Sequence, residues 1–394
     1  MFPEHSPAWM TEDLAMFRDS VRRFVEQELA PTEERWIEER RMSRDMWRRA
    51  GRAGLLCASI PEEYGGGGGN FAHEAVITSE LSRAGVTSFG NNVHSGIVAH
   101  YLLRYGNEEQ KRKWLPRMAT GELIAAIAMS EPGAGSDLRA VRTRAVRDGD
   151  HYVIDGSKTF ITNGINADLI IVVVKTAEGT GSRSVSPVVV ETEGLAGFQR
   201  GRNLAKIGQK GQDTSELFFS GMRVPCANLL GEEEGQGMFQ LVQQLAQERL
   251  IVAIISAAAM QRAPDLTVEY ASTRKVFGQR LLDLQNTRFK LAECKTYTSL
   301  AQVYVDDCIG RALAGTLDVE TAAMAKWWCS QHYGTVVDEC LQLFGGYGYM
   351  EEYPIARMYV NARVTRIYGG SNEVLKELIA RRLDPATPVR RATG

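Results

Sequence analysis

The 394-residue sequence lacks the features that mark several common classes of protein. Its six cysteines are scattered and none forms a Cys-x-x-Cys pair, which predicts buried free thiols in a reducing compartment and argues against a zinc site. No uninterrupted apolar run reaches the roughly 18 residues that a membrane span needs. The net charge is −2 and no block of basic residues occurs, so nucleic acid is not an expected partner.

The N-terminus also lacks two targeting patterns. Residues 1–6 (MFPEHS) contain neither a basic segment followed by an apolar one nor an arginine-rich transit segment. With 44% hydrophobic and 24% charged residues, the composition is that of an ordinary globular protein of two or three domains. We therefore expect a cytoplasmic protein without a metal site or a membrane span.

The sequence pattern changes twice along the chain and so predicts three domains. Residues 1–121 carry apolar positions at helical spacing, which predicts an N-terminal α-helical domain. Residues 122–236 alternate short β-rich runs with turns and show no β-α-β repeat, which predicts a middle β-barrel or sandwich domain and no Rossmann unit. Residues 237–394 predict a C-terminal four-helix bundle, so the expected fold class is α+β.

Local signals place the elements within these domains. Thr11 and Ser43 can cap helices, and Asn107 with Gln110 has the pattern of a capping box. The predicted strands are 124–129, 151–154, 169–175, 188–191 and 217–219, and the predicted C-terminal helices are 237–272, 282–312, 319–343 and 372–382. Five consecutive glycines at 65–69 predict a flexible surface turn, and Pro264 predicts a kink or a missing backbone bond.

One helical stretch combines an apolar run with two charges. Residues 251–260 contain one hydroxyl and no charge, glycine or proline, which predicts a helix buried on every face. Glu248 and Arg249 stand at its entrance and point about 100° apart, so each needs its own partner or ligand. A carboxylate in an apolar wall has a raised pKa, which suits it to accept a proton near neutral pH. The alternative is that both side chains form structural salt bridges to other helices.

Five glycine-containing segments carry groups that suit a ligand. Residues 130–137 (SEPGAGSD) follow an apolar strand, and their glycines let backbone amides approach a ligand, although a plain tight turn is the alternative. Residues 274–278 (RKVFG) offer a cation for a phosphate and a ring for a flat base. The other three are 160–164 (FITNG), 344–349 (FGGYGY) and 366–373 (RIYGGSNE). In the last, a cap at Ser371 or Asn372 would leave backbone amides pointing outward.

In order and spacing, these segments resemble the acyl-CoA dehydrogenase family over essentially the whole chain. Four phrases, one of them within the segment 366–373, are similar to the long-chain branch of that family: QERL at 247–250, YPIA at 353–356, IYGG at 367–370 and KELIAR at 376–381. A single tetrapeptide would be a weak signal. A series of motifs in the family's own order leaves chance a remote explanation.

This resemblance implies an FAD cofactor between the β domain and the C-terminal bundle of a homotetramer, a dimer of dimers. Residues that match flavin-ring contacts are Met129, Ser130, Phe160 and Thr162. Residues that match contacts to the rest of the cofactor, some across a subunit boundary, are Arg274, Phe277, Gln285, Gln342, Gly345, Gly346, Ser371 and Glu373. Residues assigned to the acyl-CoA substrate are Ser136, Arg249, Tyr368 and Gly370, with Ser136 near the CoA part.

The sequence differs from many members of the family at the position of the catalytic base. Many members place a glutamate directly after the tyrosine of an Ile-Tyr-Glu-Gly motif, where this chain has Gly369. The long-chain and isovaleryl branches place it on the buried helix instead, where this chain has Glu248. The resemblance therefore implies that Glu248 removes the α-proton of an acyl-CoA. The Gly369 N–H, together with a flavin ribityl hydroxyl, would stabilise the thioester oxygen.

The implied reaction is the α,β-dehydrogenation of an acyl-CoA. The β-hydrogen would leave as hydride to the flavin, and the electrons would pass to an electron-transferring flavoprotein. Two alternatives are flavin oxidase or monooxygenase chemistry on the same fold and a non-catalytic flavin-binding protein. A glutamate placed for α-proton removal argues against the first, and the presence of both Glu248 and the flavin motifs argues against the second.

The acyl tail is expected to reach residues 90–98 (GNNVHSGIV). The part from 94 to 98 resembles the long-chain branch, and the small Ser95 and Gly96 would leave room for a long or methyl-branched chain. Asn91 and Asn92 depart from that branch and would shorten the cavity or add polarity if they faced it. The alternative is that both only cap the helix that starts there. We expect activity on medium-to-long or methyl-branched acyl-CoAs.

Overall fold

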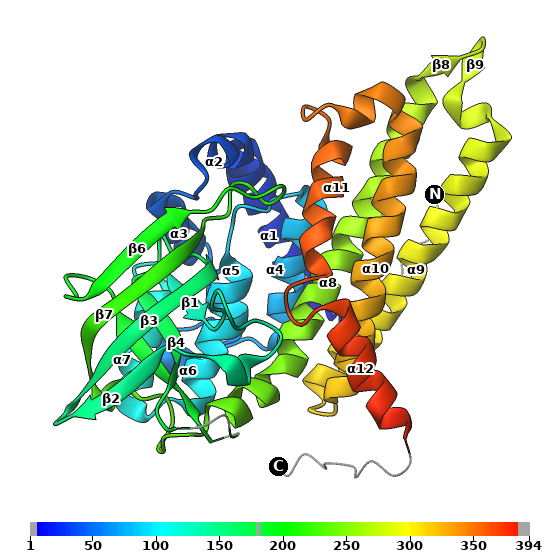
Figure 1. Ribbon diagram of the computed structural model, residues 1–394. Helices are drawn as coiled ribbons and strands as arrows, with labels where there is room; N and C mark the ends of the chain where they lie inside the picture. The colour runs from blue at the N-terminus through cyan, green and yellow to red at the C-terminus, as the bar shows by residue number, and fades with distance from the viewer. Residues whose placement is uncertain (1–5, 179–180, 182, 385–394) are drawn as a thin grey trace. The chain divides into compact units, whose positions relative to one another are not determined.

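The computed structural model describes residues 6–178, 181 and 183–384, which form two compact units (Figure 1). Unit 1 comprises the described residues of Met1–Met16, Thr78–Gly85 and Leu245–Gly394. Unit 2 comprises those of Phe17–Ile77 and Val86–Gln244. Helical segments precede and follow a β-rich middle, which confirms the predicted α+β class.

The chain before the β region is helical, as expected. Its α-helices are α1 (Glu12–Phe24), α2 (Glu33–Glu39), α3 (Arg44–Arg52), α4 (Phe71–Ala84), α5 (Asn91–Val93), α6 (His100–Tyr105) and α7 (Glu108–Ala119). The hydroxyls of Thr11 and Ser43 accept hydrogen bonds from the backbone N–H three residues later, at 3.3 and 3.4 Å. Asn107 and Gln110 form the predicted capping box at α7. These caps satisfy donors that the first helical turn leaves unpaired.

The glycine run 65–69 forms a turn at the surface, as predicted, and this turn is hydrogen-bonded and closely packed against residues 57–61. The N–H groups of four of its glycines donate to carbonyl oxygens of residues 57–61 at 2.9–3.2 Å. A Cβ on Gly66 would overlap the backbone of Ile60, and one on Gly67 would lie 2.8 Å from the carbonyl oxygen of Ala58. The missing side chains therefore let two backbone segments approach closely.

Seven strands of the described chain form one sheet in unit 2. They are β1 (Ala125–Ala128), β2 (Arg144–Asp148), β3 (His151–Thr162), β4 (Leu169–Lys175), β5 (Val185–Glu191), β6 (Phe198–Asn203) and β7 (Thr214–Pro225). The order is β1-β4-β2-β3-β7-β6, with β5 paired to β4. β1 and β2 run parallel to β4, and the other pairs are antiparallel.

Strand β4 is buried on both faces of this sheet. Its residues at 169, 171 and 173 join a core that includes side chains of α6 and α7, whereas those at 170, 172 and 174 join a second core. Successive strand residues point to opposite faces, so a continuous apolar run requires cover on both. The packed sheet supports β1, which is followed by the candidate site segment 130–137, and β3, whose last residues belong to the candidate site segment 160–164.

The sequence does not predict strands β2 and β6, because neither has an apolar alternation. Ala145 is the one buried residue of β2, and β6 has none. The helices α2 and α11 (Pro354–Thr365) are also not predicted. For α11 a signal exists, since Pro354 occupies the first helical turn, where proline is favoured.

Most of unit 1 consists of the C-terminal helices. Besides α11 they are α8 (Gly237–Thr273), α9 (Gln285–Leu313), α10 (Val319–Phe344) and α12 (Asn372–Leu383), with the first residues of α8 belonging to unit 2. Helix α10 contacts α9, α11 and α12 and so lies at the centre of this bundle (Figure 1). A hairpin of β8 (Lys275–Val276) and β9 (Gln279–Arg280) follows α8 at one end of the bundle.

Helix α8 is buried along the stretch that the sequence indicates. Leu250, Ala253 and Met260 are completely inaccessible to solvent. Pro264 does not end the helix, which continues to Thr273. Among the described helices, α8 alone is long and apolar enough to cross a membrane, with a mean hydropathy of 1.2, but 67% of that stretch is buried inside the protein. Such burial is typical of the core helix of a globular protein.

Candidate functional site

Glu248 and Arg249 lie in α8 at the start of its buried stretch, and both are withdrawn from solvent. Glu248 is 8% exposed and Arg249 is 5% exposed. Among the described residues, nothing accepts a hydrogen bond from Nε or Nη1 of Arg249. Burial lowers the pKa of Arg249, and the charges of Glu248 and Glu320 oppose that shift. Because unpaired buried donors are costly, these nitrogens have hydrogen-bonding capacity left for a ligand.

The turn between α11 and α12 brings Gly369 onto the face of α8 that carries Glu248. A Cβ on Gly369 would lie 3.3 Å from Cγ2 of Val252. Val252 follows Glu248 by four residues and therefore lies on the same face of the helix. Gly369 has a φ of +65°, which glycine adopts without the steric cost of a side chain. The two positions predicted as catalytic therefore lie on one side of α8.

Lys326 of α10 holds this turn and is a residue that the sequence does not single out. Its side chain is fully buried, and Nζ donates to the carbonyl oxygen of Gly370 at 2.7 Å and to Oδ1 of Asn372 at 3.1 Å. Burial lowers the pKa of Lys326 to about 7; the charge of Arg249 acts in the same direction, and that of Glu373 opposes it. The amine thus titrates close to neutral pH.

In unit 2, a buried lysine ties the segment after β1 to strand β3. Nζ of Lys158 donates to the carbonyl oxygen of Met129 at 3.0 Å and to the carboxylate of Glu131 at 2.8 Å. The N–H of Thr159 donates to the carbonyl oxygen of Ser130 at 2.9 Å. Burial lowers the pKa of Lys158 to about 8, an effect that the charge of Glu131 opposes. Met129 and Ser130 are therefore fixed directly beside the strand that carries Phe160 and Thr162.

Phe160 combines an exposed ring with a strained backbone. Its φ is +60°, and its side chain is 70% exposed. The register between β3 and β7 shifts between Lys158 and Ile161, so the local bulge turns the ring outward. A left-handed conformation at a non-glycine residue costs about 1–3 kcal/mol and often marks a functional site. The exposed ring suits contact with a flat ligand.

Most residues predicted to hold the rest of the cofactor lie near the hairpin end of unit 1. The guanidinium of Arg274 is 5.7 Å from the ring centroid of Tyr347. Tyr270 stacks on Phe344 with 4.2 Å between ring centroids, which joins the end of α8 to the end of α10. Phe277, at the tip of the hairpin, has a φ of +48° and is 94% exposed. Gln285 starts α9, and Gln342, Gly345 and Gly346 lie at the end of α10.

Ser371 and Glu373 lie elsewhere, at the N-terminus of α12, which starts away from the hairpin (Figure 1). Oγ of Ser371 caps the helix by accepting from the N–H of Val374 at 3.4 Å, and Glu373 is exposed. The predicted cofactor residues of unit 1 therefore form two groups. The predicted substrate residues Tyr368 and Gly370 border Gly369, and Ser136 lies exposed in the turn that follows Ser130.

Asn91 does not cap a helix, contrary to one of its two interpretations. The N-cap residue of α5 is Gly90, and no side chain caps that helix. Asn91 is buried, with Nδ2 donating to the carbonyl oxygen of Leu55 at 3.1 Å and Oδ1 accepting from Oγ of Ser95 at 2.6 Å. Ser95 in turn accepts from the N–H of Cys57 at 2.8 Å. The amide of Asn91 therefore links neighbouring segments of unit 2 through both its nitrogen and its oxygen.

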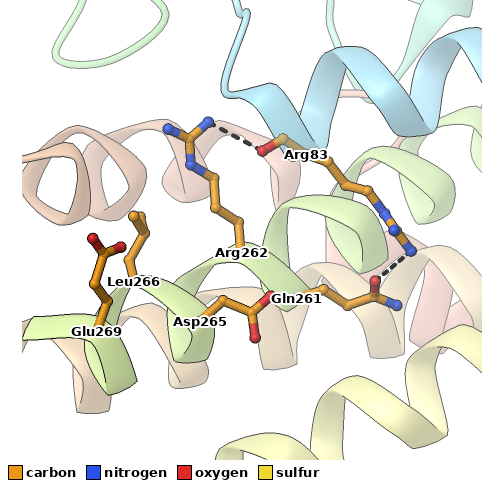
Figure 2. Close-up of a pocket in the computed structure, with 6 residues that line it drawn as sticks. All are labelled: Arg83, Gln261, Arg262, Asp265, Leu266 and Glu269. Carbon is orange, nitrogen blue, oxygen red and sulfur yellow. Dashed lines mark hydrogen bonds between the residues drawn. The ribbon is translucent and has the colours of Figure 1, made fainter. Parts of the chain in front are cut away.

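A surface pocket of about 220 Å³ lies on the C-terminal part of α8 (Figure 2). It is lined by Arg83, Gln261, Arg262, Asp265, Leu266 and Glu269. Nη1 of Arg262 donates to the carbonyl oxygen of Arg83 at 3.1 Å, and Nη2 of Arg83 donates to Oε1 of Gln261 at 2.6 Å. These bonds anchor the end of α4 to α8. None of the predicted site residues lines this pocket, and we assign it a structural role.

Comparison with known sequences identifies three consecutive matches. Sequence models described as the acyl-CoA dehydrogenase N-terminal, middle and C-terminal domains match residues 11–122, 126–222 and 235–384. The chain is 45% identical over 370 residues to the mitochondrial long-chain specific acyl-CoA dehydrogenase of Sus scrofa. That alignment covers 93% of this chain and 86% of the relative.

Solved structures of similar proteins share the whole fold. An acyl-CoA dehydrogenase from Geobacillus kaustophilus superposes with a TM-score of 0.94 at 46% identity, covering 96% of this chain and 100% of that one. A glutaryl-CoA dehydrogenase from Mycobacterium smegmatis in complex with FADH2 superposes with a TM-score of 0.88 at 28% identity, covering 96% of each chain.

Proposed function

Because the chain belongs to the acyl-CoA dehydrogenase family, we propose that it uses FAD to convert medium-to-long or methyl-branched acyl-CoAs to trans-2-enoyl-CoAs. Family membership makes it an oxidoreductase that dehydrogenates acyl-CoA thioesters. The use of FAD, the preferred length of the acyl chain and the roles of individual residues are proposed in addition to this activity. The observation that carries the proposal is the pairing of a buried glutamate, Glu248, with the side-chain-free Gly369 on one face of α8.

The residues assigned to the cofactor fit a flavin nucleotide. Phe160 and Phe277 both present exposed rings from left-handed backbone, and such rings stack on flat heterocycles. Arg274 offers a guanidinium for a phosphate. A Cβ on Gly345 or Gly346 would meet no atom within 4 Å, so a ligand can approach the backbone there. When bound, FAD would supply the acceptor for the β-hydrogen of the substrate.

Glu248 is the proposed base that takes the α-proton of the acyl-CoA. Its burial keeps bulk water away from the carboxylate, and a positioned base of this kind typically contributes about 10²–10⁴-fold in rate. The neighbouring Arg249 has two unpaired donors and so can bind the substrate or a water beside Glu248. The absence of a side chain at Gly369 leaves room for the α-carbon on the same face.

The backbone N–H of Gly369 is the proposed donor to the thioester oxygen, on which negative charge develops as the α-proton leaves. Among the described residues, none accepts a hydrogen bond from this N–H, so it is available to a ligand. One such donor is typically worth about 3 kcal/mol of transition-state stabilisation. Tyr368 and Gly370 flank the donor and would contact the substrate, with Ser136 assigned to its CoA part.

The proposal extends to partners and assembly. By resemblance, an electron-transferring flavoprotein would reoxidise the enzyme, and four copies of the chain would form a homotetramer. Large apolar side chains exposed on one face of α9, namely Phe289, Leu300 and Val303, support an assembly through that helix. The cytoplasmic location and the domain boundaries at 121 and 236 stay predictions.

Two measurements test this function. Purified protein, or protein refolded with FAD, should show the flavin absorption bands, and anaerobic addition of a suitable acyl-CoA should bleach them. Comparing kcat/KM for butyryl-, octanoyl-, palmitoyl- and a methyl-branched acyl-CoA should show the preference for longer or branched chains. Folded protein without FAD affinity would contradict the whole proposal. A clear preference for butyryl-CoA would contradict only the chain-length part.

A further inference from the structure

Four positions of α10 hold the segment that carries Gly369. Nζ of Lys326 donates to the carbonyl oxygen of Gly370 and to Oδ1 of Asn372. Oγ of Ser330 donates to the same Oδ1 at 3.0 Å. Because residues four apart share a helix face, these two donors act side by side on the start of α12.

The same face of α10 also contacts Arg366, at the other end of the segment 366–372. Nη2 of Arg366 donates to the carbonyl oxygen of Gln331 at 3.3 Å. A Cβ on Gly334 would overlap the guanidinium of Arg366, so the glycine provides the space in which that side chain lies. Residues 326, 330 and 334 follow one another at intervals of four, so they lie along one face of α10, which contacts residues 366–372.

Stability alone does not account for a lysine at position 326. Its Nζ is fully buried, and both of its hydrogen-bond acceptors are neutral oxygens. Burying an amine is costly even when it is hydrogen-bonded, and an apolar side chain of similar length would fill the space at lower cost. What the amine adds is a directed pair of bonds to Gly370 and Asn372, the two sides of one turn.

Building on the proposed function, we propose that Lys326 is a positioning residue that fixes the Gly369 N–H where the thioester oxygen binds. Gly369 and Gly370 have φ values of +65° and +88°. Two such glycines make the turn conformationally permissive, so it needs anchoring from outside. A donor displaced by about 1 Å can cost roughly 100-fold in rate.

The central test compares Lys326→Met with Lys290→Met in the FAD-loaded enzyme. Lys290 is a part-exposed lysine of α9 that bonds to Glu339 of α10, so its variant makes the same change away from the turn. We expect Lys326→Met to retain FAD, to change the KM for octanoyl-CoA little and to lower kcat by about 10–100-fold. Amide hydrogen exchange of a peptide spanning 366–373 should also quicken. Lys290→Met should leave all four quantities near the wild-type values.

Two outcomes would overturn the positioning role. One is a kcat near that of the wild type in Lys326→Met, and the other is a reduced kcat with unchanged exchange over 366–373. If Lys326→Met fails to fold, Gly334→Ala gives a second test, because it displaces only the flexible end of Arg366. It should quicken the same exchange and lower kcat. The exchange readout does not depend on activity, so a wild type that is inactive on acyl-CoA would refute the proposed function separately.

Discussion

Gly369 and Val252 lie so close that a Cβ on the glycine would be 3.3 Å from Cγ2 of the valine. This separation shows that a side chain at 369 would press against Val252, on the face of α8 that carries Glu248. A carboxylate moved from α8 to position 369 would therefore meet two obstacles. Val252 would have to shift, and a residue with a side chain would have to adopt the left-handed backbone of Gly369.

Moving the proposed base tests this relationship. Glu248→Gly should abolish turnover, and Glu248→Gly/Gly369→Glu should restore part of it. The restoration should be limited, because a side chain at a φ of +65° costs about 1–2 kcal/mol and is crowded by Val252. Adding Val252→Ala should raise the activity further, as measured by kcat/KM on octanoyl-CoA. A folded, FAD-loaded triple variant no more active than Glu248→Gly would contradict the shared location of the two positions.

The left-handed backbone of Phe160 should lower the stability of the protein, and its ring should raise the affinity for FAD. Phe160→Gly removes the ring and relieves the left-handed strain, whereas Phe160→Ala removes the ring and keeps the strain. Both variants should bind FAD more weakly, by roughly 2–10-fold, because an aromatic contact is worth about 0.5–1.5 kcal/mol. Without FAD, the glycine variant should be about 1 kcal/mol more stable than the alanine variant in urea unfolding. Unchanged FAD affinity in both variants would remove Phe160 from the proposed site.

Glu74 should make the stability of unit 2 depend on pH. The carboxyl is buried, accepts from N–H and Oγ of Ser59, and burial raises the pKa of Glu74 to about 7. Between its ordinary value of 4.5 and about 7, the folded state therefore holds a proton that the unfolded state has released. Its contribution to stability is present at lower pH and is lost as the pH rises through this window.

Glu74→Gln removes that dependence while keeping the size of the side chain. Relative to the wild type, its free energy of unfolding should rise by up to about 3 kcal/mol from pH 4.5 to 8. The exposed Glu63→Gln is the matched control, because it makes the same change outside the protein interior. The check is denaturant unfolding at several pH values, and a pH dependence of Glu74→Gln no larger than that of Glu63→Gln would contradict the assignment.

The glycine turn at 65–69 should not tolerate side chains. Gly66→Ala should destabilise the protein by about 3 kcal/mol or more, because its Cβ would overlap the backbone of Ile60. Gly310→Ala in α9 is the control, since its Cβ would meet no atom within 4 Å. There alanine should stabilise by about 0.5–1 kcal/mol. Equal unfolding midpoints for Gly66→Ala and the wild type would contradict the close-packed turn.

The parts of the fold that periodicity and local chemistry determine can be predicted from the sequence. The buried stretch of α8, the capping box at Asn107 and strand β4 all follow from patterns within one element. The six cysteines are free thiols, five buried and Cys226 half-buried, much as their scatter predicts. The polar strands β2 and β6 escape prediction, because pairing with neighbouring strands and not apolar burial determines them.

The features that the sequence does not predict, in the site and in the glycine turn, depend on neighbours that no sequence pattern indicates. Phe160 owes its left-handed backbone to the register shift against β7, which no local pattern reports. Lys326 is one lysine among many in the helices, and its acceptors lie 44 and 46 residues further along the chain. From the sequence, Gly66 is expected to be a flexible turn residue, and only the structure shows the backbone of Ile60 packed against it. In each case the residue that makes the important contact cannot be deduced from spacing in the sequence.

The most direct measurement of the central claim is anaerobic reduction of the FAD-loaded enzyme by octanoyl-CoA, comparing the wild type with Glu248→Gln. The substitution removes the proton acceptor with almost no change in volume, so FAD and acyl-CoA binding should persist. The rate of flavin bleaching should fall by about 10²–10⁴-fold, the range that a general base contributes. A Glu248→Gln variant that bleaches at close to the wild-type rate would show that the base lies elsewhere.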